Sequence, residues 1–228
     1  HRPLALAVDD VDIQPRIRQR RASYLDVRYP TAAQEAGKFK DEIIPVAGLD
    51  YDDTVRKETT LEQMAGLKPA FRQDGSVTAA TSSPHTDGAA AVMLTSAEYA
   101  QSHNLPVLAT VKAFAGSGCA PEIMGIGPVP AIERCLARAE TSLDQIDLVE
   151  VNEAFAPQYK AVEKDLGLDA AKTNADGGAI AITHPLAASG ARITIHLLHA
   201  LKRTGGRYGL GSACIGGGQG GAVVVEVF

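Results

Sequence analysis

Apolar runs and polar turns alternate regularly from Val77 to the end of the chain. Alternating or wholly apolar runs predict strands, and apolar positions three or four residues apart predict helices. On this basis we expect strands at 107–114, 147–151, 208–214 and 222–227. Between them we expect helices at 97–102, 130–139, 154–166 and from Pro185 to about Lys202. This order predicts the α/β class with a largely buried mixed sheet.

The last of these helices carries small and apolar residues. Proline is well suited to the first position of a helix, because the N–H group that it lacks has no partner there. The expected inward face consists of Ala191, Ile195, Leu198 and Leu201. An apolar face of this kind is typical of an amphipathic helix.

The first third of the chain follows a weaker pattern. A short helix is expected at 31–39, where Gly37 would close it, and a short strand at 43–46. Residues 48–75 are polar and contain several Asp and Gly residues that favour turns. This segment is therefore expected to have little hydrophobic core of its own.

A change of pattern near residue 77 suggests the boundary between two parts of the chain. Residues 1–76 are interpreted as the remnant of an N-terminal or loop region, and residues 77–228 as the main domain. The apolar run 89–94 predicts a strand or a buried helix near the start of this domain. The arginines between positions 16 and 21 are interpreted as a solvated face.

Composition and charge exclude several classes of protein. A chain of 228 residues can bury a substantial core in one large or two small domains. Its net charge of −5 gives no support for a nucleic-acid or membrane-surface role, and no apolar run is long enough for a membrane span. Three cysteines at unrelated spacings predict free thiols, with neither a disulfide framework nor a metal site. Because the chain begins at His1 without a sorting peptide, we expect the native N-terminus to lie upstream.

The stretch 174–192 is the strongest candidate for chemistry. It contains His184 between an apolar run, 179–182, and Pro185, and its other residues are mostly small. Small residues let the backbone and a ligand approach closely, and the ordinary pKa of histidine lies near neutrality. From these residues alone, His184 is either an acid–base group or a hydrogen-bonded structural histidine.

Two further motifs follow predicted strands. Asn152-Glu153-Ala154-Phe155 comes after the strand 147–151, and Cys214 is followed by Gly216, Gly217 and Gly218. Reactive groups of α/β proteins collect at such strand ends, and glycines leave backbone N–H groups free to bind a ligand oxygen. Taken singly, a strand-end Asn is usually a cap, a free Cys usually belongs to the core, and three glycines usually form a turn. Their occurrence together favours a reactive site.

These motifs resemble the C-terminal half of the thiolases, including the mitochondrial 3-ketoacyl-CoA thiolases of fatty-acid β-oxidation. The resemblance extends from about Ala32 to Val227. It is densest in four segments, Ser117-Gly118-Cys119 with Met124-Gly125-Ile126-Gly127-Pro128-Val129-Pro130, Glu150-Val151-Asn152-Glu153-Ala154-Phe155-Ala156-Pro157-Gln158-Tyr159, the His184 stretch, and Gly211-Ser212-Ala213-Cys214-Ile215-Gly216-Gly217-Gly218.

The resemblance implies roles for four residues. Thiolases use a cysteine nucleophile that takes an acyl group from a 3-ketoacyl-CoA and passes it to free CoA. His184 matches the histidine that activates this nucleophile, and Asn152 matches the residue that holds a water beside that histidine in the first oxyanion hole. Cys214 matches the second cysteine, which moves protons. The N–H group of Gly216 matches a donor of the second oxyanion hole.

The resemblance also implies binding residues, and here the sequence departs from the family pattern. Ser83 matches a serine that contacts the pantetheine arm of CoA, and Met124 matches a methionine in the wall of the substrate pocket. Thr81 and Pro84 stand where the family has Asn and Gly, and Thr183 stands where it has Gly. No cofactor and no metal are implied, since coenzyme A is a substrate.

The nucleophilic cysteine of thiolases stands in a Cys-Gly-Ser-Gly segment, and this sequence contains no such segment. The implied fold is therefore one layered αβα half with a mixed sheet, preceded by part of the loop region and without the N-terminal catalytic half. Such a half would leave an apolar face in water. We expect acyl-CoA and CoA as ligands, a missing half or partner chain, and a homodimer or homotetramer.

Two functions follow from the resemblance. In the first, the chain is the C-terminal part of a thiolase that cleaves 3-ketoacyl-CoA with CoA, and it is inactive alone because the nucleophile is missing. In the second, it is a catalytically dead protein that binds acyl-CoA or serves as a scaffold. The resemblance implies the mitochondrial matrix as the location, with the peroxisome and the bacterial cytoplasm as alternatives.

Overall fold

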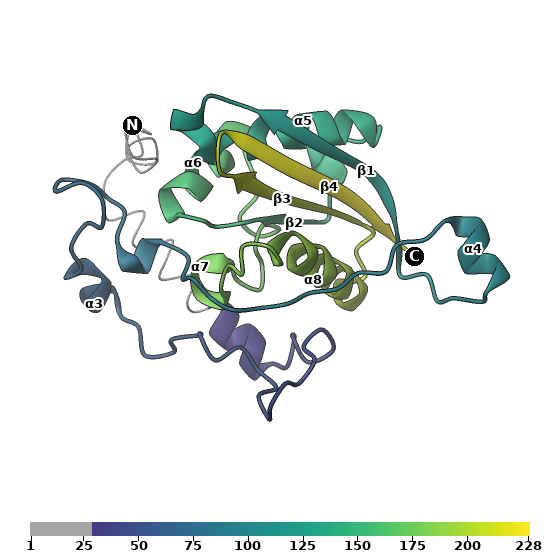
Figure 1. Cartoon of the computed structure of the whole chain (residues 1–228), viewed down its shortest axis with the longest axis horizontal. Helices are drawn as coiled ribbons and strands as arrows, with labels where there is room; N and C mark the ends of the chain where they lie inside the picture. The colour runs from purple at the N-terminus through teal and green to yellow at the C-terminus, as the bar shows by residue number, and fades with distance from the viewer. Residues whose placement is uncertain (1–28) are drawn as a thin grey trace.

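A four-stranded mixed sheet forms the centre of the protein, whose computed structural model describes residues 29–228 (Figure 1). The strand order is β1-β4-β3-β2. Strands β1 (Ala109–Gly118), β4 (Gln219–Val227) and β3 (Tyr208–Ile215) pair antiparallel, whereas β2 (Leu148–Val151) pairs parallel to β3. The predicted α/β class with a mixed sheet is confirmed.

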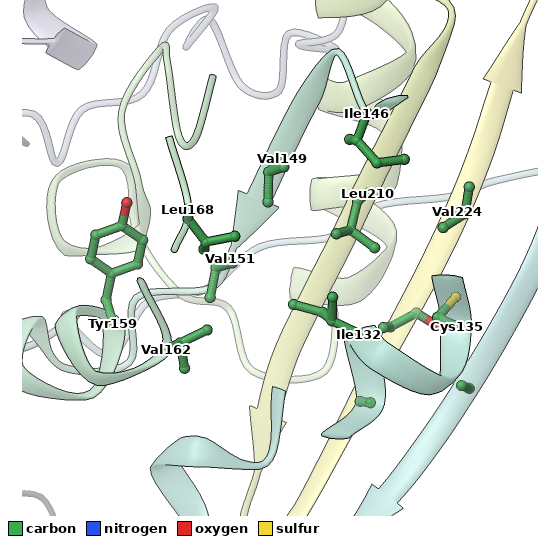
Figure 2. Packing of buried hydrophobic residues seen from close by; sticks show 13 residues of the cluster. Ile132, Cys135, Ile146, Val149, Val151, Tyr159, Val162, Leu168, Leu210 and Val224 are labelled. Carbon is green, nitrogen blue, oxygen red and sulfur yellow. The ribbon is translucent and has the colours of Figure 1, made fainter. Parts of the chain in front are cut away.

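Helices cover both faces of this sheet, so the described domain has three layers. Helices α5 (Pro128–Arg138) and α6 (Ala156–Leu166) lie on one face, and α8 (Ser189–Thr204) lies on the other (Figure 1). The core on the α5 side is built from Ile132, Ile146, Val162, Leu210 and Val224 together with their neighbours (Figure 2). Burial of these branched side chains supplies most of the driving force for folding of this layer.

Short elements connect the strands and helices. They are the 3₁₀ helices η1 (Ala79–Thr81), η2 (Pro121–Ile126) and η3 (Leu143–Gln145), and the α-helices α3 (Leu61–Ala65), α4 (Ala97–Ser102) and α7 (Ala179–Ile182). Helix α4 begins as the sequence predicts, because the Ser96 hydroxyl accepts a hydrogen bond from the Tyr99 N–H group. The sequence located all four strands and helices α4, α5 and α6 within a few residues.

Helix α8 differs from its prediction in two ways. It begins at Ser189 and not at Pro185, because the Pro185 carbonyl first closes a turn with the N–H groups of Ala188 and Ser189. Its inward face is built from Ile193, Leu197 and Leu201, which pack on Val225 and Val227 of the sheet. Of the four residues predicted to face inward, only Leu201 is fully buried, and Ala191, Ile195 and Leu198 are half-buried.

The segment 29–46 folds against the outer side of α8. It is helical from residue 29 to 35, and Gly37 follows with a positive φ of 69°, much as predicted. Phe39 packs against Ile182, and Glu42 accepts a hydrogen bond from the His196 ring at 2.9 Å. The predicted strand at 43–46 is wrong, because only an isolated bridge between Val46 and Leu49 forms there.

The apolar run 89–94 forms neither a strand nor a buried helix, so this prediction is wrong. The run is extended and exposed, and Met93 and Leu94 expose 83% and 76% of their surface. Within the described residues no strand pairs with it. Val107, Leu108, Val111 and Phe114, in and just before edge strand β1, are also exposed. We call these exposed apolar residues, together with Val92, the exposed 92–114 residues.

Candidate active site

The loop after β2 brings Asn152 to the carboxyl end of the sheet. Its N–H group donates to the Ser212 carbonyl on β3 at 2.8 Å, which fixes the backbone beside the neighbouring strand. The side chain is 1% exposed, and its Nδ2 lies 3.2 Å from Nε2 of His184. Its Oδ1 is buried without a hydrogen-bond partner in the described part of the chain. Two residues that are 32 positions apart thus meet.

His184 stands between α7 and the turn that leads into α8. Its Nδ1 lies 2.6 Å from the Ser189 hydroxyl, so both ring nitrogens have a polar neighbour. Burial lowers the pKa of the imidazole, and electrostatic interactions with Arg192 and His85 lower it further. A lowered pKa keeps the ring neutral near pH 7, which is the form that can accept a proton.

Glu153 ties the Asn152 loop to the segment that carries His184. Its carboxylate accepts hydrogen bonds from the Asn174 amide at 2.8 Å and from the Ile180 N–H group of α7 at 3.3 Å. Asn174 also bonds to both the N–H and the carbonyl group of Val151. Burial raises the pKa of Glu153 to about 7, against the lowering effect of these two hydrogen bonds. The carboxyl group therefore supports the site from within the core.

Cys214 lies on β3, two residues beyond Ser212, whose carbonyl holds Asn152. This spacing corresponds to roughly 7 Å along a strand. Among the described residues no hydrogen bond joins its thiol to Asn152 or His184. Burial raises the pKa of the thiol to about 11, so the thiol is protonated at neutral pH. Such a group can donate a proton but does not exist as a resident thiolate.

Gly216 lies in the turn of the β3–β4 hairpin, immediately after the strand that carries Cys214. The glycine is exposed, and its carbonyl accepts a hydrogen bond from the Gln219 side chain at 3.2 Å. No described atom lies within 4 Å of the position that a Cβ would occupy. Open space of this kind would allow a ligand to approach the backbone.

The two predicted binding residues lie in different surroundings. The N–H and hydroxyl groups of Ser83 both donate to the Ala154 carbonyl, at 3.0 and 3.1 Å, so Ser83 is attached to the Asn152 loop. Met124 is buried in η2. Its neighbour Gly125 packs closely on Gln158 of α6. The predicted contacts of Ser83 and Met124 with CoA stay predictions.

Thr183 immediately precedes His184 and adopts a backbone conformation that favours glycine. Its φ is 86° and its ψ is 162°. A residue with a Cβ in this region stores about 1–3 kcal/mol of strain, most for a β-branched residue. This strain lies next to the candidate base.

We expect Thr183→Gly to stabilise the chain by about 1 kcal/mol, because relief of the strain exceeds the entropy cost of glycine. Urea unfolding measures this change. Thr183→Ala is the matched control, since it removes the side-chain branches but keeps the Cβ that causes the strain. A Thr183→Gly variant no more stable than Thr183→Ala would contradict the presence of strain.

Comparison with known proteins identifies the family of the chain. The family model for the C-terminal domain of thiolases matches residues 105–227, and the model for the N-terminal domain matches residues 26–98. The chain belongs to the thiolase family. The thiolase resemblance that the sequence suggested is therefore confirmed.

Named thiolases match over most of this chain. The human mitochondrial 3-ketoacyl-CoA thiolase is 53% identical over 203 residues, which cover 86% of this chain and 51% of the relative. An acetyl-CoA acetyltransferase of Cupriavidus necator is 50% identical over 204 residues, covering 86% of this chain and 52% of that relative. The crystal structure of the human enzyme in complex with CoA superposes with a TM-score of 0.94 at 44% identity and covers 99% of this chain and 59% of that one. The chain thus spans about half the length of the curated relatives it matches.

Membrane spans, metal sites and disulfides can also be checked in the described residues. In residues 29–228 no helix combines the length and the apolar composition that crossing a bilayer requires. Nor do three or more His, Cys, Asp or Glu side chains gather as a metal site in this range. Cys119, Cys135 and Cys214 are all free thiols. The arginine cluster between positions 16 and 21 lies outside the described residues.

Two site residues received no role from the sequence. Ser189 contacts the ring of His184, and Glu153 holds two backbone segments of the site together. A signal for Glu153 was present, because a carboxylate directly after a strand-end asparagine and before apolar residues is unusual. For Ser189, the only sequence feature that could have indicated a role in the site was its hydroxyl group five residues after His184.

Proposed function

We propose that the chain is the C-terminal part of a thiolase that cleaves 3-ketoacyl-CoA with CoA, as in fatty-acid β-oxidation. The observation that supports this most directly is the pairing of Asn152 with His184 at 3.2 Å, beside the strand that carries Cys214. Family membership and the names of the relatives support the same reaction class. A neutral, half-buried imidazole next to an amide suits proton transfer and stabilisation of a thioester oxygen.

In the proposed reaction, His184 takes the proton of a cysteine thiol outside this chain. The thiolate attacks the 3-keto carbon, and the C2–C3 bond breaks with its electrons remaining on C2. Cys214 donates its proton to C2, which releases acetyl-CoA and leaves an acyl-thioester on the nucleophile. The Cys214 thiolate then takes the proton of CoA, whose sulfur attacks the acyl group. Acyl-CoA is released, and the departing thiolate of the nucleophile recovers its proton from His184.

Oxyanion stabilisation is assigned to groups of this chain. His184, once protonated, and a water held by Asn152 would bind one thioester oxygen. The N–H group of Gly216 would bind the oxygen on the carbon that the nucleophile attacks. A single donor of this kind contributes about 3–4 kcal/mol in characterised enzymes, so the fixed backbone of the Asn152 loop matters for the rate.

The partner implied by this proposal is the remainder of a thiolase, which would supply the nucleophilic cysteine. The exposed 92–114 residues are available for contact with such a partner, because apolar side chains exposed in one part can be covered by another. The complete protein would form a homodimer or homotetramer. The mitochondrial matrix is proposed as its location from the name of the human relative, although bacterial acetyl-CoA acetyltransferases match almost as well.

The test is CoA-dependent cleavage of acetoacetyl-CoA, measured for the 228-residue chain and for a chain joined to the N-terminal half of the human relative. We expect no turnover by the chain alone and measurable turnover by the joined protein. His184→Ala should reduce that turnover at least about a hundredfold, since general-base catalysis contributes about 10²–10⁴-fold. His103→Ala, an exposed histidine stacked on Tyr99, is the control.

The same experiment distinguishes the second function. A joined protein that folds and binds acetoacetyl-CoA without cleaving it would support a catalytically dead acyl-CoA-binding or scaffold protein. Turnover by the 228-residue chain alone, lost on Cys214→Ala and His184→Ala, would show that an external nucleophile is not needed.

A further inference from the structure

The Ser189 hydroxyl is placed between the ring of His184 and the backbone. Ser189 is the first residue of α8 and is 2% exposed. Its Oγ lies 2.6 Å from Nδ1 of His184 and 3.1 Å from the carbonyl oxygen of Pro185. A hydroxyl has a single proton, so it can donate to only one of these two groups.

The proton positions follow from the neighbouring groups. A carbonyl oxygen only accepts hydrogen bonds, so a Ser189 hydroxyl that donates to Pro185 leaves its oxygen to accept from Nδ1–H of His184. On the other side of the ring, the amide nitrogen of Asn152 lies 3.2 Å from Nε2. In this orientation the amide presents its NH₂ group, which only donates, so Nε2 carries the lone pair. Both neighbours therefore favour the same form of the neutral ring.

We propose that Ser189 is a positioning residue that holds His184 in the Nδ1–H tautomer. In this form the basic lone pair is on Nε2, the nitrogen that faces Asn152. If the proposed function is correct, this is the nitrogen that takes the proton of the nucleophilic thiol. Ser189 does not touch the reacting atoms and acts only through His184.

The opposite arrangement is less favourable in this geometry. If Ser189 donated to Nδ1, Nε2 would carry the proton and would face the amide nitrogen of Asn152, so that two donors would oppose each other. The Pro185 carbonyl would also lose its contact with the hydroxyl, although the N–H groups of Ala188 and Ser189 still bind it. For the amide orientation in this structure, the donor–donor contact disfavours this second arrangement.

The test is the nitrogen-15 NMR spectrum of the imidazole rings of the labelled 228-residue chain above the pKa of His184, where the ring is neutral. The His184 signals are assigned by their loss in His184→Gln. In the wild-type chain we expect Nε2 to have the shift of an unprotonated nitrogen and Nδ1 that of a protonated one. A wild-type ring with its proton on Nε2 would overturn the proposal, whatever any variant does.

Ser189→Ala should shift the tautomer ratio toward Nε2–H by about tenfold, because Nδ1–H then loses its acceptor. Thr194→Ala is the matched control, since the Thr194 hydroxyl makes the same bond to a carbonyl four residues back, that of Gly190, at 2.8 Å, without contacting an imidazole. An unchanged ratio in Ser189→Ala would overturn the proposal.

A kinetic readout in the joined protein connects this tautomer with the proposed function. We expect Ser189→Ala to lower kcat about tenfold and to change KM for acetoacetyl-CoA less than about twofold. A joined protein without turnover would contradict the proposed function, while the tautomer measured by NMR would still test the role of Ser189.

Discussion

Gly220→Ala is expected to destabilise the chain by about 3 kcal/mol or more. Gly220 lies at the start of β4, between Cys214 on β3 and Ser117 on β1. A Cβ at this position would overlap the carbonyl group of Gly127, directly before helix α5. Backbone atoms cannot move aside as a flexible side chain can, so either β4 or the start of α5 must shift. Urea unfolding followed by circular dichroism measures the loss.

Gly221→Ala is the matched control for this substitution. It changes the next residue of the same strand, where the nearest atom to a new Cβ is Cδ1 of Ile215 at an ordinary 3.7 Å. Its stability should stay within about 0.5–1 kcal/mol of the wild-type value. Equal losses in both variants would mean that the strand simply tolerates no side chain, and the close approach of Gly127 would not be the cause.

We also expect the stability of the chain to depend on pH, because the buried carboxyl group of Glu153 titrates. Its pKa is about 7 in the folded chain, because burial disfavours the charged form, against an ordinary value of 4.5. Between these two values the folded chain binds more protons than the unfolded chain. The free energy of unfolding therefore falls as pH rises, by at most about 1.4 kcal/mol per pH unit and about 3 kcal/mol over the window.

The variant Glu153→Gln isolates this contribution, because it removes the titrating group and keeps the other titrating groups of the site, including His184. The difference in unfolding free energy between the wild-type chain and Glu153→Gln should fall from about pH 4.5 to 7 and be constant above that range. Glu226→Gln is a control of opposite sign, since hydrogen bonds from Arg207 and Lys112 lower the pKa of Glu226. For this control, the difference in unfolding free energy between the wild-type chain and Glu226→Gln should decrease as the pH falls. A flat difference for Glu153 would show that its carboxyl group is charged in the folded chain.

Local sequence patterns were sufficient to predict most of the helices and strands in and around the sheet. The Ser96 cap, the apolar spacing in α5 and the alternation in β3 each act within a few residues, so the sequence predicted them well. The run 89–94 is equally apolar, but a strand needs a neighbour to pair with, and the described chain offers none. Pairing depends on distant residues, so a local pattern cannot reveal it.

For the site, the sequence predicted the types of residue but not their connections. The resemblance implied that Asn152, His184 and Cys214 share one pocket. Asn152 and His184 lie side by side, whereas no hydrogen bond among the described residues joins the Cys214 thiol to either of them. The carboxylate of Glu153 reaches a residue 27 positions away, and no pattern within either motif shows such a link. The start of α8 was misplaced because Pro185 suits both a helix start and the turn that it closes. That shift places Ser189, and not Pro185, at the first turn of the helix.

The contacts of the segment 29–46 with α8 also bear on the order of folding. Lys38 binds Asp176 at 2.5 Å and its carbonyl accepts from Arg203, which is 165 residues away along the chain. Closing so long a loop in an unfolded chain would cost about 4 kcal/mol of entropy, more than a partly exposed ion pair returns. We therefore expect the segment to attach only after the sheet and α8 have formed. Its docking is a late step in folding, and it should be among the first parts to detach when the chain opens locally.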